Sequence, residues 1–177
     1  MNGLWRSLLC TLPQFADKCP WEELDGSNWS SLLQKQPQFA DKCLWKKLDG
    51  YDWSRLLQKQ PQFADKCPWE KLNGSDWSSL LQNQPQFANK CDWSNLDGED
   101  KGYPSRDWSS LLQKQPQFAD KCPWKKLDGY DWSKLLQEQP QFANKCPPDS
   151  HLPLSERERV TSADCGAVEK GSCRSVF

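Results

Sequence analysis

The stretch that decides the fold is Trp53–Asp76, WSRLLQKQPQFADKCPWEKLNGSD, because closely similar copies of it fill most of the chain. The first Trp of the stretch recurs at a spacing of 24 residues, and nearly six copies run from Met1 to Cys146. A fixed period of this length is the sequence signature of a solenoid, in which neighbouring units share one core. The copies start at Trp5, Trp29, Trp53, Trp77, Trp108 and Trp132.

One junction between copies is longer than the others. It carries seven extra residues, 99–105, which include Gly and Pro, so we expect this junction to be an exposed turn. We predict a six-copy array over residues 1–147. Residues 148–177 are polar and aperiodic, and we predict a disordered tail there.

The amino-acid composition of the array argues against an ordinary β-sheet. No Val, Ile or Thr occurs between Leu12 and Ser150, and β-branched residues are those that strands favour. The alternative is a hairpin at Asp-Gly turns such as Asp49-Gly50. The flanking residues lack the alternation of strands, so we predict an all-α fold, a solenoid of short helices.

The first part of each unit is predicted to be an α-helix. Trp53, Leu56 and Leu57 stand at i, i+3 and i+4, which places them on one helix face. Asp52 is the expected N-cap. Pro61 disfavours helical geometry in the residue before it, so the helix should end there.

Two shorter turns are predicted to complete the unit. Pro61 suits the first position of a second helix, with Phe63 and Cys67 on its buried side. A third turn, Pro68–Leu72, is followed by Gly74, which we expect to supply a left-handed C-terminal cap. Eight apolar side chains per unit are too few for a separate core, so the units must stack.

The motif WSxLLxxQPQFADKCxWxKLDG resembles the Trp-rich, Cys-containing short tandem repeats found in arrays in otherwise uncharacterised bacterial proteins. The resemblance covers Trp5 to Cys146 and implies no activity. In its period, the unit is also similar to leucine-rich-repeat-variant solenoids, which alternate helices in units of this length. This second likeness is an analogy of architecture.

The charge balance argues against nucleic acid and membranes as partners. The formal net charge is −1, whereas phosphate binders carry a net basic field. No apolar run reaches the roughly 18 residues of a membrane span. Met1–Leu12 aligns with the repeats rather than with a signal peptide, so we expect a cytoplasmic chain, with secretion left open.

The array has one Cys per unit, which argues for packing rather than chemistry. Metal sites need clustered Cys and His, and the only His of the chain, His151, lies in the tail. We expect buried free thiols; a redox role, with a Lys before each Cys, is the alternative. The tail thiols Cys165 and Cys173 are expected to be exposed. The predicted core ladder includes Cys43, Cys67, Cys91 and Cys122.

No catalytic motif is present in the sequence. There is no nucleophile elbow, no Gly-rich phosphate loop and no paired-carboxylate cluster outside the repeat consensus. The recurrent Asp of the unit is Asn89 and Asn144 in two copies, which a required ionised group would not permit. We expect no enzyme activity, no cofactor and no metal.

The two Trp of each unit are predicted to differ in exposure. Trp53 shares a helix face with two Leu and should be buried, whereas the second Trp, such as Trp69, should be half exposed. Exposed indoles stack on sugar rings. A glycan-binding array that uses the second Trp is therefore the alternative to a protein-interaction scaffold.

Differences between the copies indicate where a partner would bind. The apolar frame is nearly constant, while variation gathers at polar positions that we expect to face solvent. Tyr and basic residues suit an interface with another protein. The predicted contact residues are Tyr51, Tyr103, Tyr130, Lys46, Lys47, Lys125 and Lys126.

The first unit departs from the consensus at its polar positions. Leu4, Cys10 and Leu12 replace polar residues, although the end of a solenoid needs a polar face. We predict that this end either associates with another chain end-on or belongs to a longer array.

Overall fold

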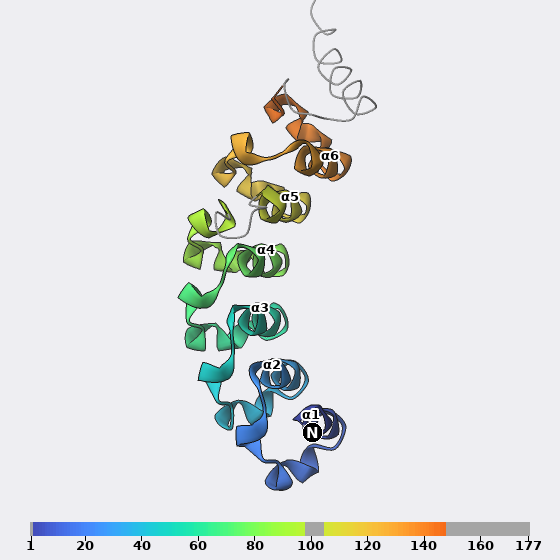
Figure 1. Ribbon diagram of the computed structural model, residues 1–177, viewed down its shortest axis with the longest axis vertical. Helices are drawn as coiled ribbons and strands as arrows, with labels where there is room; N and C mark the ends of the chain where they lie inside the picture. Colours follow the sequence, from blue (N-terminus) through green and yellow to red (C-terminus); the bar gives the residue numbers. More distant parts are fainter. Residues whose placement is uncertain (1, 98–104, 148–177) are drawn as a thin grey trace, which may run out of the picture. The chain divides into compact units, whose positions relative to one another are not determined.

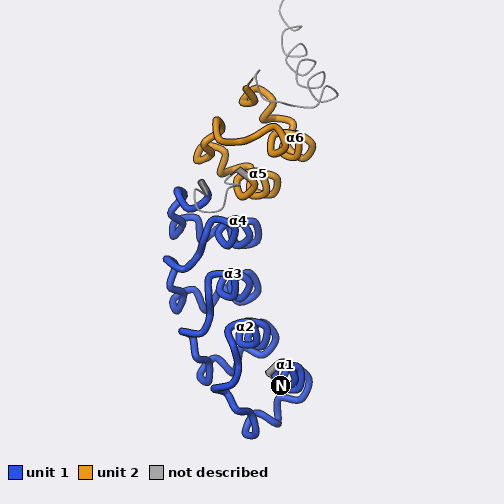
Figure 2. The backbone as a smooth tube through the Cα atoms, in the orientation of Figure 1, with its two compact units in different colours: residues 1–96 blue, residues 97–177 orange. Residues whose placement is uncertain are grey.

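In the computed structural model, residues 2–97 and 105–147 are described, and they contain α-helices and 3₁₀ helices but no strand. The chain forms two compact units, residues 1–96 and 97–177, called here the N-terminal and the C-terminal unit (Figure 2). The predicted tail falls outside the described residues. The α-helices are α1 Asn2–Thr11, α2 Gly26–Lys35, α3 Gly50–Lys59, α4 Gly74–Asn83, α5 Ser105–Lys114 and α6 Gly129–Glu138.

Each of the first five repeats consists of one α-helix and two 3₁₀ helices, and the last shows α6 and one 3₁₀ helix in the described residues, which confirms the predicted all-α repeat fold. In the N-terminal unit, α1 packs on α2, α2 on α3 and α3 on α4, with the 3₁₀ helices in a second row beside them (Figure 1). In the C-terminal unit, α5 packs on α6. The 3₁₀ helices are Pro13–Lys18, Trp21–Glu23, Pro37–Asp41, Trp45–Lys47, Pro61–Lys66, Trp69–Lys71, Pro85–Lys90, Trp93–Asp97, Pro116–Lys121, Trp124–Lys126 and Pro140–Lys145.

The predicted N-cap was wrong by three residues. The cap of α3 is Asp49, whose carboxylate accepts a hydrogen bond from the backbone N–H of Asp52 at 2.8 Å. The Asp52 carboxylate in turn accepts from the Asp49 N–H, so the two form a capping box. The helix therefore begins one turn earlier than its apolar face indicates.

The predicted role of glycine as a C-terminal cap was also wrong, because Gly26, Gly50 and Gly74 are the first residues of their helices. The reason for glycine is close approach to the next repeat. A Cβ on Gly50 would lie 2.3 Å from the backbone oxygen of Lys71 and 2.6 Å from Asp76 Oδ2. Successive repeats thus come too near one another here for any side chain.

Proline ends each α-helix as predicted. Helix α3 stops at Lys59, and Gln60 takes a non-helical conformation (φ −131°, ψ 69°) before Pro61 opens the next segment. That segment is 3₁₀ rather than α. It has only six residues before Cys67, whose backbone is extended and ends the segment.

The core is built from the Trp and Leu of the α-helices, as expected. Trp29, Trp53 and Trp77 are at most 1% exposed. Within each compact unit, the second Trp of a repeat is half-buried and stacks on the first Trp of the next repeat; the Trp69 and Trp77 rings are 5.4 Å apart at 16°. The junctions inside a unit therefore join two repeats through an aromatic stack.

Polar side chains bond the backbone of neighbouring repeats. Ser54 Oγ donates to the carbonyl of Asp76 at 2.9 Å, and Gln60 Nε2 donates to the carbonyl of Gln34 at 2.9 Å. Such bonds can satisfy helix carbonyls that lack an intrahelical partner. They also fix the register of two neighbouring helices. Among the described residues, no helix is long and apolar enough to cross a membrane.

Candidate partner-binding surface

The outward side of each α-helix carries one residue per turn. In α3 these residues are Tyr51, Arg55 and Lys59, at i, i+4 and i+8, and Tyr51 is 59% exposed. We call the corresponding surface of the N-terminal unit the helical face. It comprises Arg6, Ser7, Thr11, Ser27, Ser31, Lys35, Tyr51, Arg55, Lys59, Ser75, Ser79 and Asn83.

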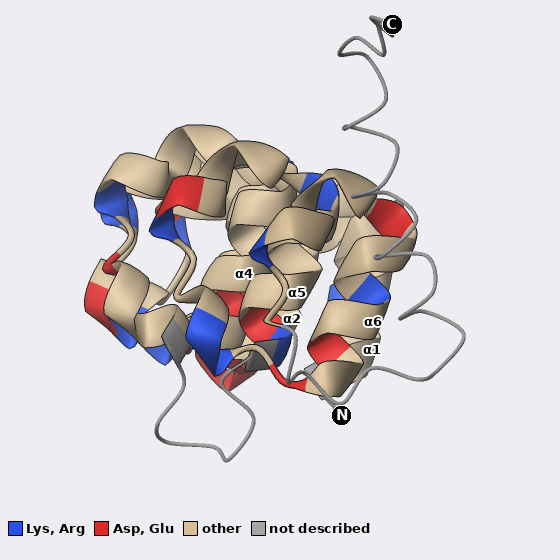
Figure 3. Ribbon diagram, turned by 90° about the horizontal axis from the view of Figure 1, so that it is seen from above, with Lys and Arg blue, Asp and Glu red and all other residues tan. Residues whose placement is uncertain are grey.

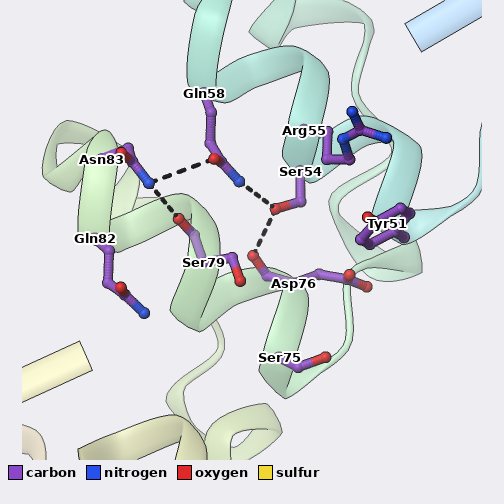
Figure 4. Close-up of a pocket in the computed structure, with 9 residues that line it drawn as sticks. All are labelled: Tyr51, Ser54, Arg55, Gln58, Ser75, Asp76, Ser79, Gln82 and Asn83. Carbon is purple, nitrogen blue, oxygen red and sulfur yellow. Dashed lines mark hydrogen bonds between the residues drawn. The ribbon is translucent and has the colours of Figure 1, made fainter. Parts of the chain in front are cut away.

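A pocket of about 340 Å³ opens on this face between α3 and α4 (Figure 4). Its lining residues come from both helices, and hydrogen bonds cross the gap between them. Asn83 Nδ2 donates to Gln58 Oε1 at 3.4 Å and Ser54 Oγ donates to the Asp76 carbonyl at 2.9 Å, while within α3 Gln58 Nε2 donates to Ser54 Oγ at 3.2 Å. The pocket is lined by Tyr51, Ser54, Arg55, Gln58, Ser75, Asp76, Ser79, Gln82 and Asn83.

The tyrosines predicted as contact residues lie beside cations. The Arg55 guanidinium is 5.5 Å from the centre of the Tyr51 ring. Tyr130, at the same place in α6, has Arg106 at 5.5 Å and Lys134 at 5.8 Å. These contacts orient an exposed ring without burying it. Tyr103 lies outside the described residues.

The predicted lysines lie on 3₁₀ helices and do not line the Tyr51 pocket. Lys47 Nζ donates to the carbonyl of Leu24 at 2.9 Å and also to that of Glu22. Lys47 therefore bonds the preceding repeat, whereas Lys46 is exposed with no such bond. Lys125 and Lys126, in the C-terminal unit, are both exposed.

The copies of the repeat vary at the positions of both lysines. The position of Lys47 is also Lys in the next copy, Lys71, which donates to the carbonyl of Leu48 at 3.1 Å. It is Glu23 and Asn95 in two other copies, and the position of Lys46 changes to Glu22 and Glu70. Variation among the copies therefore does not separate the two lysines, and the bonds of Lys47 and Lys71 came from the structure.

A second groove, of about 490 Å³, lies between the 3₁₀ helices Pro61–Lys66 and Pro85–Lys90. The second Trp of the repeat, here Trp69, lines this groove, but neighbouring side chains pack against its ring. The equivalent Trp45 stacks on Trp53 at 5.3 Å, touches Phe63 at 5.3 Å and has Lys66 Nζ at 5.5 Å from a ring centre. Little of the indole remains open for a sugar ring.

The thiols of the core ladder are free and largely enclosed. Cys43 and Cys67 are buried, while Cys91 is half-buried. Burial raises the pKa of Cys43 to about 12, against an opposing effect of Lys66, and also raises the pKa values of Cys67 and Cys91 to about 12. Such thiols stay protonated, which works against a redox role. Cys122, in the C-terminal unit, is likewise buried.

No group of three His, Cys, Asp or Glu within residues 2–97 and 105–147 is arranged to hold a metal ion. The buried titratable group that stands out is Asp52, which is 5% exposed. Burial, followed by the nearby Asp49 carboxylate, raises the pKa of Asp52 to about 6. Its place in the capping box gives it a structural role.

The N-terminal edge is apolar, as the sequence suggested. Leu4 is 74% exposed, Leu12 40% and Phe15 43%. Cys10 is half-buried, and its carbonyl accepts a hydrogen bond from Gln36 Nε2 at 3.1 Å.

No known protein family, curated protein or solved structure matches this chain. Its function must therefore be inferred from the geometry of these surfaces.

Proposed function

We propose that this chain is a non-enzymatic scaffold that binds another protein through the helical face. The observation that carries the proposal is the pocket between α3 and α4. Its outward residues, the exposed Tyr51 and Asn83 and the half-buried Arg55, stand at positions that change from copy to copy, on a frame of nearly constant Ser, Gln and Leu. A constant frame with variable outward residues is how repeat proteins achieve recognition.

The experiment is site-specific photo-crosslinking. A photoreactive residue at position 55, inside the pocket, is compared with one at position 65, on the exposed 3₁₀ row. We expect one discrete protein to crosslink from position 55 only. Replacing Tyr51, Tyr103 and Tyr130 with Ser should abolish the product, and unchanged capture by this triple variant would contradict the proposal.

The glycan-binding alternative has less support, because the second Trp ring is packed by Trp, Phe and Lys neighbours. Iodide quenching distinguishes the two functions. A sugar platform would be quenched and then protected by added glycan, whereas the packed rings should show little of either effect.

We also infer that the repeat belongs with the Trp-rich, Cys-containing tandem repeats of bacterial proteins that it resembles. A cytoplasmic location fits the free cysteines of the array, since thiols persist in a reducing compartment. The apolar residues Leu4, Cys10 and Leu12 support end-on self-association as a second contact. Replacing Leu4 and Leu12 with Gln should then lower the sedimenting mass at high concentration.

A further inference from the structure

We propose that the helical face of the N-terminal unit binds an extended acidic segment of a partner protein. The inference rests on the proposed function and adds to it the chemistry of the partner.

The cations of the helical face are not used by the fold. Across the part of the chain that the structure describes, Arg6, Lys35, Arg55 and Lys59 form no ion pair. The only contact recorded for Arg55 is with the Tyr51 ring, which leaves the N–H groups of the guanidinium for a ligand.

The cations of the 3₁₀ row are used differently. Lys42 pairs with Asp41 at 3.4 Å, Lys47 and Lys71 donate to backbone carbonyls, and Lys66 lies over the Trp45 ring. Four cationic side chains of the 3₁₀ row thus have partners within the fold, whereas the four on the helical face form no ion pair with the described residues.

The helical face also lacks exposed carboxylates along the helices. Helices α1 to α4 contain only two acidic residues, Asp52 and Asp76, and both are buried. Exposed carboxylates occur only at the beginning of the helices, at the N-caps Asp25 and Asp49. Charge complementarity therefore favours an acidic ligand that lies across the later turns of these helices.

Apart from Tyr51, the remaining side chains of the face are Ser, Thr and Asn, which are small and neutral and let a peptide backbone approach. A further pocket, of about 270 Å³, lies between α1 and α2 and is lined by Arg6, Ser7, Cys10, Thr11, Ser31 and Lys35. Ser and Thr hydroxyls beside the cations can both donate to and accept from a peptide. The cations thus border grooves that provide hydrogen-bonding partners.

The spacing of the cations predicts the spacing of the acids. Lys35 and Lys59 hold equivalent positions on adjacent helices, and packed helices are about 10 Å apart. A chain in the extended polyproline II conformation advances about 3.1 Å per residue with three residues per turn, so a ligand that crosses the helices should present a carboxylate at roughly every third residue. Binding of nucleic acid would instead be governed by a net basic field, which this near-neutral chain lacks.

The repeat offers a substitution that should leave the fold intact. The position of Lys35 and Lys59 is Glu138, the last residue of α6, and Figure 3 draws the acidic residues of the helices in red. Lys35→Glu combined with Lys59→Glu therefore reverses the charge of the face with a residue that the repeat already accepts.

The test is fluorescence anisotropy with the full chain and a labelled peptide that carries Glu at every third position among Ser. We expect saturable binding that the Lys35→Glu/Lys59→Glu variant weakens by at least about tenfold. The control variant, Lys18→Glu/Lys42→Glu, has the same net charge but alters the 3₁₀ row, and it should bind as the wild type does.

Equal weakening by both variants would overturn the proposal, because the effect would then be non-specific. So would equal binding of a peptide with Glu clustered at one end, or tighter binding of a single-stranded oligonucleotide of the same length. If crosslinking from position 55 still captures a protein while the acidic peptide fails, the scaffold function stands and only the acidic partner is excluded.

Discussion

The junction between α1 and α2 has fewer polar contacts between its helices than the later junctions of the N-terminal unit. Between α2 and α3, Ser30 Oγ donates to the carbonyl of Asp52 at 2.9 Å, and a Cβ on Gly26 would lie 2.2 Å from Asp52 Oδ2. In α1 the place of Ser30 is taken by Arg6. Only the Gln bond of the α2–α3 junction recurs there, from Gln36 to Cys10.

This contrast shows that the apolar packing of two neighbouring helices does not depend on the Ser and Gly contacts between their repeats. Leu9 of α1 is as fully buried as Leu33 of α2, so the first junction packs normally without the polar contacts. The glycine, serine and lysine of the later junctions therefore set how closely, and in which register, two repeats meet.

The largest effect should come from filling the space at a glycine. Gly50→Ala places a methyl group 2.3 Å from the backbone oxygen of Lys71, which cannot move without displacing the next repeat. We expect a loss of about 3 kcal/mol in the free energy of unfolding, measured by urea denaturation.

The matched control is Gly3→Ala in α1, because no atom lies within 4 Å of a Cβ there. Alanine favours the helix, so this change should be neutral or stabilise by up to about 1 kcal/mol. Equal destabilisation by both variants would show that close approach is not the reason for Gly50.

The next largest loss of stability should come from removing the buried hydroxyl of Ser54. Ser54→Ala removes the bond to the Asp76 carbonyl and the acceptor of Gln58, and Ser54 is 1% exposed. We expect a loss of about 1–2 kcal/mol. Ser79→Ala, on the exposed side of α4, should stay within about 0.5 kcal/mol of the wild type, and a comparable loss there would refute the distinction.

A smaller effect should separate the two neighbouring lysines. Lys47→Met loses the bonds to the carbonyls of Leu24 and Glu22 and should cost about 1 kcal/mol. Lys46→Met loses no such bond and should leave stability unchanged, as judged by thermal unfolding. If Lys46 were the more costly residue, the assignment of Lys47 to the junction would be wrong.

Much of the fold was predictable from the sequence, since the period, the helix face of Trp53, Leu56 and Leu57, and the break at Pro61 depend on local chemistry. The role of glycine was not predictable, because a glycine required by contact with the next repeat cannot be told in sequence from a glycine that caps a helix. Asp52 was misassigned for a related reason. Two Asp flank the helix start, and only the observed backbone shows that Asp49 is the cap.

The surface was predictable in part. Tyr51 and Tyr130 were identified because their positions vary, and both are exposed. Arg55 was not among the predicted contact residues, and its contact with Tyr51 across one helical turn came from the structure. Lys47 was predicted as a contact residue together with Lys46, and only the structure shows that it bonds the preceding repeat.

The smallest effect should appear as a pH dependence at Asp52. The pKa of this carboxyl is raised to about 6 in the folded chain from 3.8, so folding favours its protonated form. Its contribution is therefore fully present below pH 3.8 and is lost as the pH rises through about 6. The wild type should melt at a higher temperature at pH 5 than at pH 7, provided that the other groups contribute little over this range.

Asp52→Asn should reduce that difference, because the amide stays neutral and can still accept the bond from the Asp49 N–H. The chain has a precedent in Asn28, which holds the same position in α2 and donates to Asp25 Oδ1 at 2.6 Å. Asp65→Asn, at an exposed position that is Asn89 in another copy, is the control and should leave the pH dependence of the wild type unchanged. A wild type that melts higher at pH 7, with Asp52→Asn showing the same trend, would mean that the Asp52 carboxylate is not penalised by its burial between repeats.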